Sequence, residues 1–151
     1  MKFRQILFCF AGIIFSSFLL NFLWESLHGY SLYTGHIIDS DKYVRMMVYM
    51  SFMDSVTILV IYLVCAFFMK DALWLRELNR RRGIIFFVIG LIVAVTAEYW
   101  AVYVAHEWHY NNRMPVMLGI GLSPFFQLSV TGLMSLWLTK KLTTSGNGKM
   151  R

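Results

Sequence analysis

Two carboxylates lie inside long apolar segments of this 151-residue chain, and they are the residues best suited to chemistry. Glu98 falls in the apolar run over residues 84–105, and Asp54 falls in the run over residues 43–69. A carboxylate inside a membrane costs on the order of a few kcal/mol unless it is paired, protonated or facing water. If the two approach each other, one holds a proton at neutral pH, and such a pair can act as acid and base. We therefore take Glu98 and Asp54 as the candidate catalytic acid and base.

Polar residues on two other segments extend this set. Asn21, Glu25 and His28 are spaced i, i+4, i+7, so they share one helix face if the first helix continues that far. Gln127 lies inside the last apolar run. We assign Glu25 as an accessory catalytic acid, and Asn21 and Gln127 as groups that bind and orient a ligand. The competing interpretation is that Asn21 and Gln127 only form hydrogen bonds between helices, as polar residues in membrane bundles often do.

Aromatic residues gather near the same ends of the apolar segments. An aromatic belt at a membrane interface accounts for such a group. The alternative is a wall around a hydrophobic or cationic ligand, for which Trp24 and Tyr99 are the candidate binding residues. The group comprises Trp24, Tyr30, Tyr33, Tyr43, Tyr99, Trp100, Tyr103, Trp108 and Tyr110.

The histidines permit a metal interpretation. His106 and His109 are spaced i, i+3 with Glu107 between them, and His28 and His36 fall on the same side of the predicted membrane. First-row transition metals accept such ligands. No fixed ligand motif such as H-E-x-x-H is present, and interfacial histidines are common. We therefore predict no metal site and no cofactor.

Methionine and cysteine offer two further alternatives. Met47, Met50 and Met53 form M-x-x-M-x-x-M, a pattern compatible with Cu(I) but also with ordinary helix packing or a flexible lining for a lipid-like ligand. Cys9 and Cys65 each lie in an apolar run, and the chain has no C-x-x-C motif. This argues against a thiol–disulfide membrane enzyme, and we expect both cysteines to be small core residues.

The elements that must position these residues are four long apolar runs. Hydrophobic residues make up 58% of the chain, against roughly 45–50% in soluble domains, and the mean hydropathy is +0.59. About 20 apolar residues in a helix cross a bilayer core ~30 Å thick. We therefore predict an all-α membrane protein, a four-transmembrane-helix bundle over residues 1–138, followed by a disordered basic tail over residues 139–151. The predicted spans are 5–24, 43–69, 84–105 and 116–138.

Basic residues predict the orientation of the bundle. Cytoplasmic loops of membrane proteins carry an excess of Lys and Arg. Eleven basic residues fall on the side of the two termini and the middle loop, against three on the other side, Lys42, Arg45 and Arg113. We predict a multi-pass protein of the bacterial cytoplasmic (inner) membrane with both termini in the cytoplasm. Because the positive charge flanks apolar spans, the net charge of +6 indicates anionic lipid headgroups rather than nucleic acid.

With this orientation, all four spans place polar groups in the outer half of the membrane. We infer one shared pocket that opens outward. Gly119, Gly121 and Pro124 predict a kink early in the last span, beside Gln127, which suits a cavity wall. The segment over residues 70–83, KDALWLRELNRRRG, favours a short helix that lies in the membrane interface.

Several short motifs carry a resemblance. These are N-F-L-W-E at 21–25, Glu98, W-H-Y at 108–110, M-P at 114–115, G-I-G-L-S-P at 119–124 and Gln127. Together they resemble a set of small uncharacterised bacterial four-span membrane proteins, which implies no activity. Trp24-Glu25 followed by a tyrosine is also faintly similar to the small membrane terpene cyclases, in which such a glutamate donates the starting proton. Those enzymes are larger and have more spans.

Two classes of function remain open. The first is an enzyme that acts on a lipid or isoprenoid-like substrate by carboxylate acid/base chemistry. The second is non-enzymatic, either a subunit or assembly factor of a larger membrane complex or a small proton-coupled carrier. The expected partners are membrane lipids, a hydrophobic small-molecule ligand, and a second copy of the chain or another membrane protein.

Overall fold

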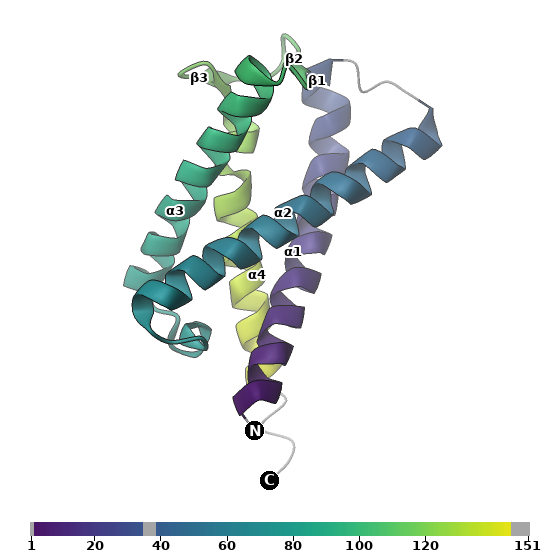
Figure 1. Cartoon of the computed structure of the whole chain (residues 1–151). Helices are drawn as coiled ribbons and strands as arrows, with labels where there is room; N and C mark the ends of the chain where they lie inside the picture. The colour runs from purple at the N-terminus through teal and green to yellow at the C-terminus, as the bar shows by residue number, and fades with distance from the viewer. Residues whose placement is uncertain (1, 35–38, 146–151) are drawn as a thin grey trace.

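The computed structural model describes residues 2–34 and 39–145. Within these residues the chain forms four long α-helices (Figure 1). The helices are α1 Lys2–Leu32, α2 Ser40–Met69, α3 Arg80–Tyr99 and α4 Leu122–Ser145. The start of α1 and the end of α4 lie at one end of the bundle, which we call the terminal end (Figure 1). The opposite end carries four short strands between residues 33 and 121, and we call it the strand end.

Three of the helical segments are long and apolar enough to cross a membrane. They are Phe3–Leu32, Ser40–Met69 and Arg80–Val104, with mean hydropathies of 2.3, 2.2 and 2.1. Large apolar side chains cover their outer faces, and Phe67 is 79% exposed. Such a surface suits lipid rather than water. The prediction of an all-α membrane protein is supported to this extent, whereas α4 has 24 residues and is not among the three.

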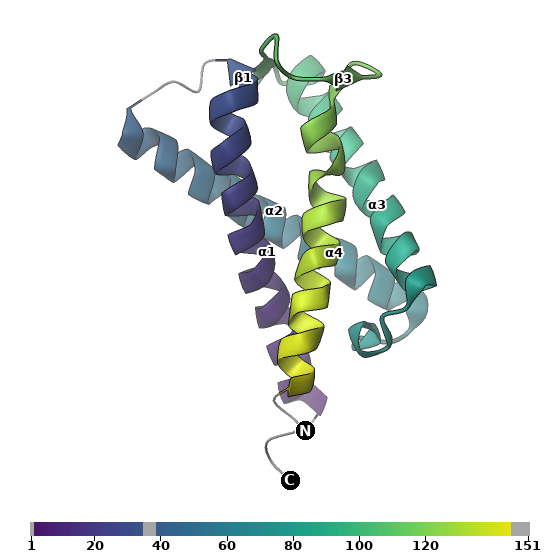
Figure 2. The same cartoon turned by 180° about the vertical axis from the view of Figure 1, so that it is seen from behind.

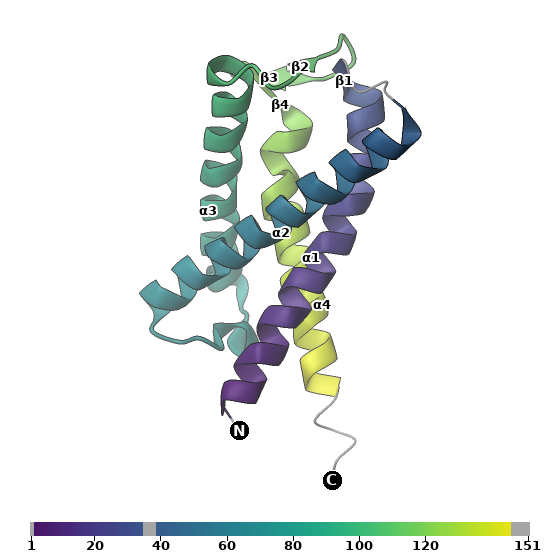
Figure 3. The same cartoon turned by 45° about the vertical axis from the view of Figure 1, so that its right-hand side comes forward.

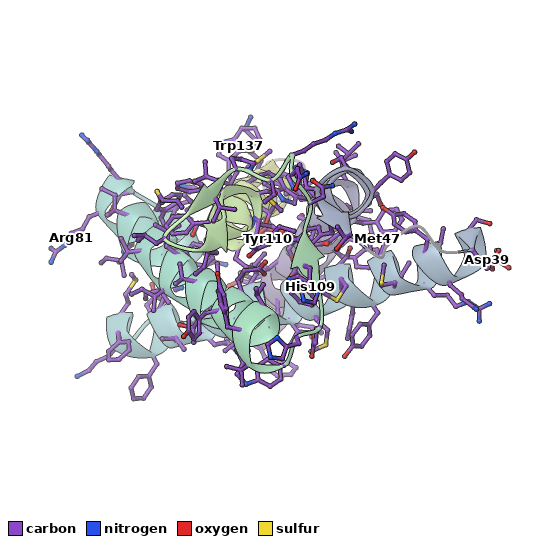
Figure 4. All side chains as sticks on the ribbon, turned by 90° about the horizontal axis from the view of Figure 1, so that it is seen from above. Asp39, Met47, Arg81, His109, Tyr110 and Trp137 are labelled. Atoms are coloured by element: carbon purple, nitrogen blue, oxygen red, sulfur yellow. The ribbon has the colours of Figure 1, made fainter. Side chains whose placement is uncertain are left out.

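The helices are arranged around α4. Figures 1 and 2 show α4 between α1 and α3, antiparallel to both, and α4 packs against each of them. The helix α2 crosses the other three diagonally on one face, packing along α1 and reaching α3 at the terminal end (Figure 3). Seen from the strand end, Asp39 lies far out at the start of α2, while Met47 lies near the bundle (Figure 4). The helix between α1 and α3 is therefore the one that carries Gln127.

An apolar core fills the half of the bundle near the terminal end. Trp74 and Tyr62 are fully buried there, with stacked rings 4.9 Å apart. The Trp74 indole nitrogen donates to the Tyr62 carbonyl at 3.3 Å, and the Tyr62 hydroxyl donates to the Ala72 carbonyl at 2.9 Å. These contacts correct the expectation of an interfacial helix at 70–83. Only a short 3₁₀-helix, η1 Trp74–Glu77, forms there, and its apolar residues pack into the protein instead of facing lipid.

Small residues allow the helices to approach closely. A Cβ atom built on Gly90 of α3 would lie 2.7 Å from Ser129 Oγ and 3.2 Å from Ser129 Cα of α4. A Cβ on Gly12 of α1 would lie 2.8 Å from a methyl carbon of Thr139. Close backbone contact at small residues is the usual packing of membrane helices.

Two antiparallel strand pairs close the strand end. The first joins β1 Tyr33–Thr34 to β2 His109–Tyr110, and the second joins β3 Val116–Met117 to β4 Ile120–Gly121. Between α3 and β2 the chain forms a π-helix, η2 Trp100–Val104. The chain therefore folds back over the ends of α1, α3 and α4.

The helix ends differ from the expected spans for local reasons. The turn between β3 and β4 places Leu118 and Gly119 at φ 54° and 82°, so α4 begins at Leu122 and not near Val116. Pro124 then falls in the first turn of α4, where its missing N–H has no helical partner to lose, so it interrupts no helical hydrogen bond as the expected kink requires. The helix continues to Ser145 where a disordered tail was expected, and residues 146–151 lie outside the described part. Likewise α1 runs to Leu32, past the expected end of the first span at residue 24.

Candidate carboxyl site between α1, α2 and α4

One side-chain amide joins two acids from different helices. The Gln127 Nε2 of α4 lies 2.5 Å from Glu25 Oε1 of α1 and 2.7 Å from Asp54 Oδ2 of α2. The two carboxyl oxygens are therefore at most about 5.2 Å apart, the sum of these distances. The same nitrogen lies 3.3 Å from Asn21 Oδ1. We call Asn21, Glu25, Asp54, Gln127 and Thr131 the carboxyl site.

Acceptors outnumber protons in the carboxyl site. The Gln127 amide has two hydrogens for three side-chain oxygens. The Thr131 hydroxyl has one hydrogen, and it lies 3.0 Å from Asn21 Oδ1 and 2.8 Å from the Gln127 carbonyl. The Asn21 amide is directed elsewhere, to the Ser17 carbonyl at 2.9 Å. The Glu25 and Asp54 carboxyl groups approach the same amide nitrogen, and two acids this close favour a state in which one of them is protonated.

Helical periodicity explains why these groups meet. Asn21 and Glu25 are one turn apart on α1, and Gln127 and Thr131 are one turn apart on α4, which runs antiparallel to α1. Each α1 residue therefore finds a partner on α4. A third pair, His28 Nδ1 and Ser123 Oγ, continues the series toward the strand end.

These three pairs form a polar ladder between α1 and α4. In order toward the strand end its rungs are Asn21–Thr131, Glu25–Gln127 and His28–Ser123. Asp54 joins the middle rung from α2.

Glu98 sits apart from this ladder under a cap of loop residues. Its Oε1 accepts from the Tyr110 hydroxyl at 2.7 Å, the Trp108 indole nitrogen at 3.1 Å and the Tyr33 hydroxyl at 3.4 Å. Tyr33 and Tyr110 are opposite each other in the β1–β2 pair, which brings both hydroxyls to one point. Figure 4 shows Tyr110 over the middle of the bundle. We call Tyr33, Trp108 and Tyr110 the Glu98 cap.

The capping tyrosines act as donors. Burial raises the pKa of Tyr33 and of Tyr110 above the ordinary tyrosine range, and the neighbouring Glu98 raises both further. Both hydroxyls therefore keep their protons at physiological pH. With three donors on one oxygen and an exposed fraction of 6%, Glu98 is held as a hydrogen-bond acceptor that fixes the loops.

The sequence-based site residues are thus only partly brought together. Asn21, Glu25 and Asp54 all contact the Gln127 amide. Glu98 is bound instead by the residues of its cap. The assignment of Glu98 and Asp54 as one acid/base pair is not reproduced by these contacts.

Of the two aromatic residues proposed to bind a ligand, only Trp24 lies beside the polar ladder. The Trp24 ring packs edge-on against His28 with centroids 4.8 Å apart, beside the ladder. Tyr99 is 55% exposed and contacts the Tyr103 ring, so it does not reach the carboxyl site.

Two participants were not identified from the sequence. Ser123 and Thr131 flank Gln127 at spacings of four residues, and this i−4, i, i+4 pattern on an otherwise apolar helix was the available signal. The donors in the Glu98 cap were noted only as members of an aromatic belt.

The residues considered as metal ligands or reactive thiols lie outside the carboxyl site, apart from His28. Among residues 2–34 and 39–145, no group of three or more His, Cys, Asp or Glu side chains could hold a metal ion, and His36 lies outside the described residues. Met47 is buried and Met53 is 44% exposed, so the methionine series does not share one face. Cys9 and Cys65 are buried and free.

Comparisons with protein-family models, curated proteins and solved structures found no match. The function is therefore inferred from the chemistry of the carboxyl site.

Proposed function

We propose that the chain is a four-span protein of the bacterial inner membrane with its strand end facing outward. The proposal is supported by charge, because the described basic residues of the terminal end outnumber those of the strand end. Lys42, Arg45 and Arg113 belong to the strand end. Arg4, Lys70, Arg76, Arg80, Arg81, Arg82, Lys140 and Lys141 belong to the terminal end. As the fourth span, α4 is long enough at ~36 Å for 24 residues.

The function proposed for this protein is acid/base catalysis on a lipid or isoprenoid-like substrate. Glu25 and Asp54 are the acid and base, and Gln127 and Asn21 orient them. The observation that carries this proposal is the Gln127 amide held between the two carboxyl oxygens. One shared proton leaves one group able to donate while its partner can accept.

Access from the bilayer favours catalysis over helix packing alone. Asn21 is fully buried and Gln127 is 7% exposed, whereas Glu25 and Asp54 each keep a minor part of their surface exposed. Asp54 lies beside Phe52 and Met53, which are 52% and 44% exposed on the apolar surface of α2. A polar group used only to join helices would gain from complete burial, since hydrocarbon offers its exposed atoms no partner. A hydrophobic substrate arriving through the membrane reaches the carboxyl pair at this surface.

In this proposal Glu98 takes a different role from the one expected. Its cap ties the loops across the strand end and limits access of water to the carboxyl site. Exclusion of water strengthens electrostatic interactions inside a site and suppresses side reactions.

A second candidate function rests on the same exposed surface. A partner helix covering Asp54 would satisfy its remaining hydrogen-bonding capacity, which suits a subunit or assembly factor of a membrane complex, or a homo-oligomer. A small proton-coupled carrier would also use the shared proton.

Lipid analysis separates these functions. Lipid extracts are compared between wild-type cells, cells in which the gene is deleted, and deleted cells that express Asp54→Asn. The matched control is Asp41→Asn, which changes an exposed acid on the same helix. We expect Asp54→Asn to reproduce the altered extract of the deletion, and Asp41→Asn to restore the wild-type extract. Unchanged lipids in the deletion, together with loss of another protein from the membrane, would support the assembly role instead.

A further inference from the structure

The third rung of the polar ladder contains an imidazole, a group that the carboxyl site lacks. His28 Nδ1 and Ser123 Oγ are hydrogen-bonded, and both side chains are half-buried at the strand end. The rung follows the Glu25–Gln127 rung by three residues on α1 and four residues on α4, so it is adjacent to it along both helices. It lies between the carboxyl site and the water beyond the strand end.

Packing alone does not require a histidine here. A hydroxyl–hydroxyl or hydroxyl–amide pair would join the helices equally well, whereas imidazole gains and loses a proton near neutral pH. Among residues 2–34 and 39–145, no carboxylate lies within 4.0 Å of the His28 ring nitrogens, so the ring is not held as an ion pair. The groups facing the ring are Ser123 from α4 and the Trp24 ring from α1.

A buried donor lies next to this rung. The Trp24 indole nitrogen is buried and has no hydrogen-bond partner among the described residues. Trp24 directly precedes Glu25 and contacts His28. Its N–H is available to bind a water molecule beside the His28 ring, and unpaired buried donors usually bind one.

We infer that the His28–Ser123 pair carries protons between water at the strand end and the Glu25–Asp54 carboxyl pair. This inference rests on the proposed function and names the route by which its acid is restored. The route uses the tautomer in which Nδ1–H donates to Ser123 Oγ, so Nε2 carries the lone pair and is the nitrogen that exchanges protons. Nε2 accepts a proton from a hydronium ion at the strand end, which becomes water, and a second water molecule relays one proton from Nε2 to the Glu25 carboxylate. Imidazolium returns to imidazole and the carboxylate becomes a carboxylic acid, so charge and protons balance. Ser123 is a positioning residue.

Infrared spectroscopy of the purified protein measures both steps. The protonated carboxyl band is assigned by its loss in Asp54→Asn and Glu25→Gln, and its decay is followed after a rapid rise in pH. We expect His28→Gln to keep the band at equilibrium but to slow its decay by about a hundredfold, the lower end of general acid–base effects. Ser123→Ala should slow it less, because the ring remains. The control is His109→Gln, an exposed histidine at the same end, which should leave the rate unchanged.

Rescue distinguishes a relay from a structural role. His28→Ala with added imidazole should recover the decay rate if the ring carries the proton, and its melting temperature reports any loss of fold. An unchanged rate in His28→Gln, or a slow His28→Ala that imidazole does not restore, would overturn the relay while leaving the carboxyl site intact. Absence of the band in the wild-type protein would overturn the proposed function itself, and with it this route.

Discussion

Glu25 on α1 and Asp54 on α2 share one donor, the Nε2 atom of Gln127 on α4, at 2.5 and 2.7 Å. Two acids from different helices therefore depend on a single amide of α4. Neither acid has a basic partner in the described residues, where one ion pair, Arg82–Glu77, is formed at the terminal end. The arrangement is held by hydrogen bonds to one amide, so it is sensitive to small changes in polar chemistry.

Removing the shared donor should destabilise the bundle. Gln127→Leu keeps the approximate size of the side chain but leaves the carboxyl oxygens of Glu25 and Asp54 without their amide. An unsatisfied buried acceptor costs about 1–3 kcal/mol. We expect a loss of about 3 kcal/mol, measured as a fall of several degrees in the melting temperature in detergent.

The matched control for this change is Thr96→Val. It removes a hydroxyl that is exposed on α3 and bonded only to the Ile92 carbonyl one turn earlier. Its effect should stay within about 0.5 kcal/mol. Equal melting temperatures for Gln127→Leu and Thr96→Val would show that the carboxyl site contributes nothing to stability.

Two glycines on α3 should respond in opposite directions to the same substitution. Gly90→Ala places a methyl group 2.7 Å from Ser129 Oγ and 3.2 Å from the Ser129 backbone, so α3 and α4 must separate. We expect a loss of about 1–3 kcal/mol. Gly83→Ala meets its nearest atom only at 3.9 Å and should gain about 0.4–1 kcal/mol from the less flexible unfolded chain. Thermal unfolding of both variants in one detergent checks the pair, and a stable Gly90→Ala protein would contradict the close helix contact.

The sequence predicts those features of the site that depend on neighbouring residues, and it does not predict those that depend on contacts between distant segments. Apolar length indicates helices, and i, i+4 spacing places Asn21 and Glu25 on one face, because both are local properties. Which helix faces which is decided by packing. Asp54 lies near Glu25 because α2 crosses α1 diagonally. No local sequence pattern predicts this crossing.

Glu98 shows a second limit of the sequence pattern. Its partners lie in the β1–β2 pair and in the loop after η2, so they depend on how distant loops fold back. The start of α4 was misplaced because Leu118 and Gly119, which form the turn between β3 and β4, sit in an apolar run that looks helical by hydropathy.

Cysteine labelling tests the proposed orientation. In a background without Cys9 and Cys65, single cysteines at Ser40 and Asn112 lie at the strand end, and one at Ala72 lies at the terminal end; all three positions are exposed. We expect a membrane-impermeant thiol reagent to label the first two in intact cells and to label Ala72→Cys only after the membrane is opened. Labelling of Ala72→Cys from outside would reverse the orientation and place the carboxyl site in the inner half of the membrane.

The stability of the Glu98 cap should depend on the charge of residue 98 more than on the size of its side chain. Glu98→Gln keeps a carbonyl oxygen for Tyr33, Trp108 and Tyr110, but each bond to a charged acceptor, worth about 1.5–3 kcal/mol, becomes a neutral one worth about 0.5–1.5 kcal/mol. We therefore expect faster hydrogen exchange of the β1–β2 amides and a melting temperature lower by a few degrees.

Function separates the two roles considered for Glu98. If it anchors the cap, Glu98→Gln should retain a substantial part of the lipid activity in the deletion strain, and Tyr110→Phe, which removes the 2.7 Å bond, should loosen the same amides. If Glu98 transfers a proton, the glutamine variant should lose activity completely while its melting temperature stays at the wild-type value, because glutamine cannot titrate. That second result would return Glu98 to the catalytic pair and remove Glu25 from it.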